Sequence, residues 1–257
     1  MQAQDFLRSG DLDQALASLK DEVRSQPAEV KHRVFLFQLM AVLGDWERAL
    51  NQLNVAGELD AETFPMVQAY REVLQCEALR GEVFAGQRSA TLFGEPAEWS
   101  ALYVQALSLA GDEANKVRAQ ALELAPDVAG NIDGKPFEWL IDGDSRIGPI
   151  VEAVVNGVYY WIPMQHIKRI KFEAPEDLRD MVWLPATFEW RNEGQAVGFV
   201  PVRYAGSERS GDAQIQLSRK TEWQELGDEQ FSGLGQRMLM TPDDEVALLD
   251  IREIEFD

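Results

Sequence analysis

One short motif occurs twice near the start of the chain, first as Gly10-Asp11-Leu12-Asp13-Gln14-Ala15-Leu16 and, 34 residues later, as Gly44-Asp45-Trp46-Glu47-Arg48-Ala49-Leu50. A period of 34 residues is that of the tetratricopeptide (TPR) helix-turn-helix unit. The residue types fit that unit, because glycine ends one helix, aspartate caps the next, and a small alanine lets two helices cross closely. The repeat therefore predicts paired helices in this part of the chain.

The helical pattern extends over residues 1–129. Apolar side chains recur at three-and-four spacing from Leu12 to Leu19, which places them on one helical face. Only two copies of the repeat are well formed, whereas about three are normally needed to bury a core. We therefore expect the repeat to pack against further helices over 63–84 and 97–111. The sequence predicts a TPR-like domain over residues 1–129 rather than a regular array.

From residue 130 onward, β-branched and aromatic residues, glycine and proline become dense. The stretches 151–155 and 158–162 flank Asn156-Gly157, which supplies the positive φ angles that a tight hairpin turn needs. Further short strands are expected over 137–141, 167–172, 181–190, 196–201 and 251–256. The predicted fold class is α+β, with a small antiparallel β-rich domain, a barrel or a sandwich, over residues 130–257.

The composition excludes several classes of function. With 24 Lys and Arg against 44 Asp and Glu, the formal net charge is -20, so nucleic acid and anionic membrane surfaces would be repelled. The most apolar stretch, residues 34–43, is too short and too interrupted to span a membrane. Cys76 is the only cysteine, and the first residues lack a signal-peptide core. We expect a soluble cytoplasmic protein with no nucleic-acid or membrane partner.

The common enzyme motifs are missing from the sequence: it has no Gly-rich phosphate loop, no His-Glu-x-x-His, no Gly-x-Ser-x-Gly and no CxxC pair. We therefore expect no enzyme activity and no cofactor. The enzyme that remains as an alternative is a metal-dependent hydrolase that uses Asp142, Asp144 and Glu152, since paired carboxylates bind oxygen-loving cations. The other ligands of a calcium loop are missing, which favours a turn whose aspartates accept backbone N–H groups.

Aromatic residues mark two candidate surfaces. In the strand Tyr159-Tyr160-Trp161, alternation places Tyr160 on one face and its two neighbours on the other. In the helical half, a concave groove would accept a helix or peptide from a partner. The residues that we expect to line this groove are Phe35, Leu39, Trp46, Tyr70 and Leu74.

Short motifs also occur in a characteristic order along the chain. After the repeat motif at residues 44–49 come Phe137-Glu138-Trp139, residues 142–146 with Gly148-Pro149, Tyr159-Tyr160-Trp161-Ile162-Pro163, Leu178-Arg179-Asp180 followed by Trp183 and Pro185-Ala186, Pro201-Val202-Arg203-Tyr204, Gly206-Ser207, Arg219-Lys220-Thr221-Glu222-Trp223, and Gly235-Gln236-Arg237. The repeat motif is shared with many TPR proteins, but the ordered set from 137 to 237 is specific. In these motifs, and over nearly its whole length, the chain resembles the ImpE/TagJ accessory proteins of bacterial type VI secretion.

The resemblance implies a non-enzymatic accessory role in a contractile secretion machine. It implies that the partner is the N-terminal helical segment of the small sheath subunit, TssB, and that the role is linked to sheath disassembly by the AAA+ ATPase ClpV. A general TPR-type chaperone or assembly factor with another client is the main alternative. The metal-dependent hydrolase is the less favoured one.

Overall fold

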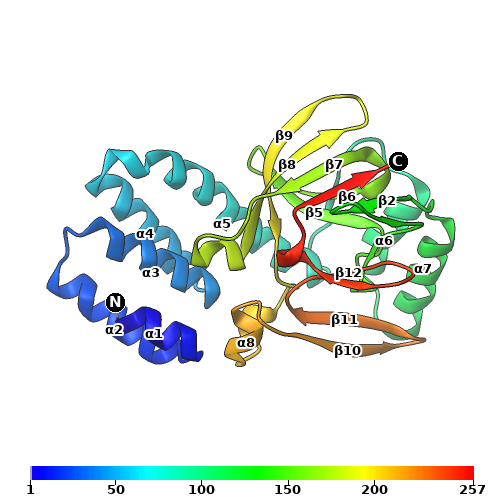
Figure 1. Cartoon of the computed structure of the whole chain (residues 1–257). Helices are drawn as coiled ribbons and strands as arrows, with labels where there is room; N and C mark the ends of the chain where they lie inside the picture. Colours follow the sequence, from blue (N-terminus) through cyan, green and yellow to red (C-terminus); the bar gives the residue numbers. More distant parts are fainter. Residues whose placement is uncertain (1) are drawn as a thin grey trace.

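The computed structural model describes residues 2–257 as a helical N-terminal part followed by a β-rich C-terminal part, as the sequence predicts (Figure 1). The helices of the first part are α1 (Gln2–Ser9), α2 (Leu12–Ser25), α3 (Val30–Val42), α4 (Trp46–Leu59), the 3-10 turn η1 (Ala61–Thr63), α5 (Phe64–Phe84), α6 (Glu98–Ala106) and α7 (Gly111–Leu124). No helix within residues 2–257 is long and apolar enough to cross a membrane.

The repeated motif forms the same local structure twice. Gly10 and Gly44 have positive φ angles of 80° and 74° and end α1 and α3. The side chains of Asp11 and Asp45 accept hydrogen bonds from the backbone N–H groups of Gln14 and Arg48 and cap α2 and α4. The predicted helix ends are confirmed, while the assignment to the TPR class stays a prediction.

The later helices separate into two groups. The helix predicted over 63–84 is confirmed, and α5 packs against α4 and runs to the sheet (Figure 1). The helix predicted over 97–111 ends earlier, at Ala106, and α6 packs against α7 at the β-rich end of the molecule. The α6–α7 pair therefore does not continue the stack of α1 to α4.

The main sheet has nine strands in the linear order β1-β6-β5-β9-β8-β7-β14-β2-β3. Its strands are β1 (Thr91–Leu92), β2 (Gly130–Ile132), β3 (Lys135–Phe137), β5 (Ile150–Val155), β6 (Val158–Pro163), β7 (Ile167–Phe172), β8 (Trp183–Trp190), β9 (Gln195–Pro201) and β14 (Glu253–Phe256). All pairings are antiparallel except that of β1 with β6, so the sheet is mixed. The barrel and sandwich alternatives stay predictions.

Two smaller sheets complete the β-rich part. One is the hairpin of β10 (Thr221–Gly227) and β11 (Gln230–Gly235), and the other joins β4 (Ile141–Asp142), β12 (Met238–Met240) and β13 (Glu245–Ala247). The short helical elements are η2 (Met164–His166), η3 (Leu178–Met181), η4 (Ser207–Arg209), α8 (Ala213–Gln216) and η5 (Leu248–Asp250).

The strongest strand prediction is confirmed. Strands β5 and β6 form the expected hairpin, and Asn156 and Gly157 at its turn have φ angles of 50° and 73°. The strand predicted over 137–141 is wrong as a single element, because β3 ends at Phe137 and β4 begins at Ile141.

One hydrophobic core joins the two parts of the chain. It contains Phe37 and Tyr70 from the helices together with Trp161 and Trp183 from the sheet. A second core lies within the β-rich part and is built by residues such as Ile162, Ile170, Phe188 and Ile254. The expected alternation in β6 is confirmed, because Tyr159 and Trp161 belong to the first core and Tyr160 packs against the second.

Candidate functional site

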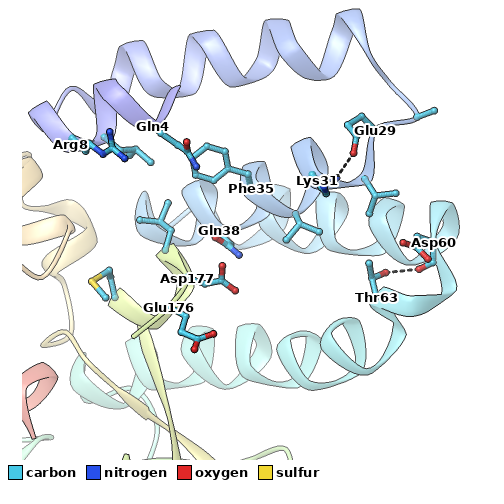
Figure 2. A pocket seen from close by; sticks show the side chains of 16 residues that line it. Gln4, Arg8, Glu29, Lys31, Phe35, Gln38, Asp60, Thr63, Glu176 and Asp177 are labelled. Atoms are coloured by element: carbon cyan, nitrogen blue, oxygen red, sulfur yellow. Dashed lines mark hydrogen bonds between the residues drawn. The ribbon is translucent and has the colours of Figure 1, made fainter. Parts of the chain in front are cut away.

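The helical half carries an open groove with a volume of about 840 Å³ (Figure 2). Helix α1 forms one wall, α3 forms the floor, and η1 together with the segment that leads into η3 forms the opposite wall. The lining residues are Gln4, Leu7, Arg8, Ala28, Glu29, Val30, Lys31, Val34, Phe35, Gln38, Asp60, Thr63, Glu176, Asp177, Leu178 and Met181. The groove is thus shared between the helical part and one segment of the β-rich part.

The five predicted partner-binding residues lie in different places. Phe35 is partly exposed and lines the groove. Leu39, Tyr70 and Leu74 are 0%, 5% and 3% exposed and belong to the core. Trp46 is partly buried and lines a second cavity of about 440 Å³ beside α5. A partner can therefore reach Phe35 directly, whereas it would have to uncover Leu39, Tyr70 and Leu74.

The β-rich part covers the face of α5 on which Tyr70 lies. The Tyr70 ring centroid is 5.1 Å from that of Phe199 on β9, and the Arg179 guanidinium of η3 lies 4.9 Å from the Tyr70 ring. Burial is the main cause that raises the pKa of the Tyr70 hydroxyl well above its usual value of 10. The sequence predicts this face to be open to a partner, because its apolar pattern does not show what covers it.

Sequence reasoning missed the wall that η3 brings to the groove. The Asp180 carboxylate accepts the backbone N–H groups of Glu176 and Asp177 at 2.9 and 2.8 Å, which fixes the chain where it enters η3. Leu178 and Met181 add apolar surface to the groove. Asp177 and Asp180 are three residues apart, a spacing that is a recognisable signal for the start of a helix. This signal does not reveal that η3 packs on α3.

Glu152, one of the three carboxylates of the hydrolase hypothesis, forms ion pairs with two arginines. It is fully buried on β5 and accepts Nε–H of Arg80 at 2.7 Å, and it also pairs with Arg237 and with the Tyr159 hydroxyl. Burial alone would raise its pKa, but the two guanidiniums outweigh burial and hold the pKa at about 2. Glu152 is thus a charged structural group within the core.

The other two carboxylates of the cluster form the turn that the sequence favours. Asp142 accepts the N–H of Asp144 at 2.8 Å, and Asp144 accepts the N–H of Arg146 at 2.9 Å. Both carboxylates are also paired with arginines, Asp142 with Arg237 and Asp144 with Arg146. The predicted turn is confirmed, and residues 2–257 contain no group of three or more His, Cys, Asp or Glu that could hold a metal ion.

Addition of Mg²⁺ or Ca²⁺ is therefore expected to leave the melting temperature unchanged, because a cation at this cluster would have to displace buried arginines from Asp142 and Glu152. Thermal unfolding with and without each metal, followed by circular dichroism, measures this. A stabilisation that disappears in Asp144→Ala would contradict the expectation and revive the hydrolase hypothesis.

Comparison with known proteins shows the family to which the chain belongs. Residues 134–255 match the sequence model of the family described as ImpE protein, so most of the β-rich part is an ImpE domain. The type VI secretion system accessory component TagJ of Pseudomonas aeruginosa strain PAO1 is 49% identical over 100% of this chain and 92% of its own length. The chain therefore belongs to the ImpE/TagJ family, and the resemblance found in the sequence motifs is confirmed.

A solved structure shows the same fold. The crystal structure of protein VPA1032 from Vibrio parahaemolyticus matches with a TM-score of 0.89 and covers 100% of this chain and 98% of that chain. The two sequences are 24% identical, so this likeness concerns the fold alone.

Proposed function

We propose that the chain is a non-enzymatic accessory protein of a type VI secretion system, acting in the cytoplasm. Its partner would be the N-terminal helical segment of the small, TssB-like sheath subunit, and its role would be linked to sheath disassembly by the ATPase ClpV. Membership of the ImpE/TagJ family and the description of TagJ as an accessory component support the secretion role.

The groove on α3 is the observation that carries the binding proposal. The apolar residues that line it include Leu7, Val34, Phe35, Leu178 and Met181, and Figure 2 shows Phe35 among the lining side chains. An amphipathic helix binds such a channel by placing the apolar residues of one face, spaced three and four apart, against it. In this proposal Phe35 is the central contact of the groove, Leu39, Tyr70 and Leu74 act from the buried core, and Trp46 lies apart from the groove at the second cavity.

Isothermal titration of the full chain with a synthetic peptide of the cognate sheath segment tests the proposal. Saturable binding near one to one is expected. Phe35→Ala is expected to weaken it about fivefold or more, since loss of a central aromatic contact usually costs more than about 1 kcal/mol. Phe231→Ala is the matched control, because Phe231 is 40% exposed on β11 in the other half of the chain.

The expected control result is an unchanged affinity for Phe231→Ala. If titration detects no binding of either the peptide or the intact sheath complex, the sheath is not the partner. Capture of another client from cells that lack the secretion system would then favour the general chaperone.

A further inference from the structure

We infer that the groove selects its partner by charge, and that the β-rich part supplies two of the three selecting carboxylates: the helix that binds carries lysine or arginine along the flank that faces η1 and η3. This inference rests on the proposed function, because it concerns the helix that the same groove would take up.

The wall built by η1 and η3 is acidic. Asp60, Glu176 and Asp177 all line the groove there, and Figure 2 shows them on one side of Phe35. Glu176 is exposed and forms no ion pair within 4.0 Å to any residue of 2–257. Asp177 pairs with Arg179 at 2.6 Å and is partly neutralised. Most of this negative charge is therefore available to a bound cation.

The rest of the groove lacks this excess of negative charge. Arg8 on α1 and Lys31 on α3 line it, and Arg8 pairs with Asp5 on the same helix at 3.4 Å. Glu29 lies beside Lys31 and accepts its backbone N–H, so each of these two cations is accompanied by a carboxylate. A helix with cations on one flank therefore gains charge pairs in one rotational setting only, with that flank against the acidic wall.

The acidic wall is held in place before a partner arrives. Arg179 lies over the Tyr70 ring and contacts the sulfur of Met66, so η3 is fixed to α5. The Asp180 carboxylate in turn fixes the backbone of Glu176 and Asp177. Preorganised charges lose less entropy on binding than mobile ones. The β-rich part thus builds one half of the partner site.

The net charge of the chain supports a basic partner segment. A formal net charge of -20 attracts cationic segments over a range set by the salt concentration. Each exposed pair contributes little by itself, so we expect discrimination of about tenfold from the carboxylates acting together, decreasing as salt rises.

The test uses the full chain and three synthetic helical peptides that share one apolar stripe. One flank of the stripe carries lysines in the first peptide, glutamates in the second and glutamines in the third, and the cognate sheath segment is titrated beside them. The lysine peptide is expected to bind about tenfold more tightly than the glutamate peptide at low salt. Glu176→Lys is expected to remove or invert this preference.

Glu123→Lys is the matched control, because it makes the same change of net charge at an exposed position of α7 outside the groove. It is expected to keep the preference. Equal affinity for the three peptides, or an unchanged preference in Glu176→Lys, would overturn the inference even if the sheath segment binds. If neither the sheath segment nor any designed peptide binds, the proposed function fails together with it.

Discussion

Replacement of Arg80 by alanine is expected to lower the free energy of unfolding by about 3–5 kcal/mol, the usual cost of removing one partner of a buried ion pair. The Arg80 side chain on α5 is 3% exposed and that of Glu152 is 0% exposed. Nη2 of Arg80 also donates to the backbone carbonyl of Arg203 at 2.8 Å. Without Arg80, the one cation within residues 2–257 still paired with Glu152 is Arg237, which also pairs with Asp142, and the Arg203 carbonyl loses a buried donor.

Urea unfolding of the wild type and the variant measures this difference. Arg88→Ala is the control, because Arg88 pairs with Glu82 while their side chains are 65% and 49% exposed. An exposed pair of this kind is expected to change stability by no more than about 0.5 kcal/mol. A similarly small effect for Arg80→Ala would contradict the structural role assigned to the buried arginine.

Replacement of Trp183 by alanine is expected to cost about 3–5 kcal/mol, as for other fully buried large aromatic residues. Trp183 begins β8 and is 0% exposed. Its ring centroid lies 5.9 Å from that of Trp46 on α4 and 6.1 Å from that of Tyr70 on α5, and its Nε1 donates to Glu77 at 2.9 Å. The change therefore opens a cavity where the helices meet the sheet and leaves the partly buried Glu77 carboxylate with one donor fewer.

The measurement for Trp183→Ala is urea unfolding followed by both helical circular dichroism and tryptophan fluorescence. Trp223→Ala is the control, since Trp223 on β10 is 38% exposed, and its cost is expected to stay near 1 kcal/mol. We propose 1–129 and 130–257 as the domains of the chain, but expect them to unfold together through their shared core. Two separate transitions in the wild type would contradict that expectation.

Local features of the fold were predictable because their causes lie within a few residues. Gly10 and Asp11 end one helix and cap the next, and Asn156 with Gly157 provides the φ angles of a hairpin turn. The β10–β11 hairpin was missed, because Asp228 and Glu229 adopt φ angles of 52° and 59° at its turn without the usual Asn-Gly signal. Strand β1 is two residues long and gives no pattern at all.

The candidate site was harder to predict because it depends on contacts between distant residues. Phe35 was predicted to line a concave groove of the helical half, and it lines the groove on α3. Glu176 and Asp177 were not, since they reach the groove only through the packing of η3 on α3. In the same way, Glu152 looked like a possible catalytic carboxylate until Arg80, 72 residues away in sequence, was seen to pair with it.

Strand β1 determines where the chain can be cut into fragments. Thr91 and Leu92 belong to the helical part by sequence, yet they pair with Tyr160 and Trp161 and form the edge of the main sheet. A recombinant fragment that starts at residue 130 would leave the aromatic strand β6 as a bare edge, the kind of surface that joins to other copies. Such a fragment is expected to aggregate, and a cut made before β1 is the better starting point for dissecting the protein.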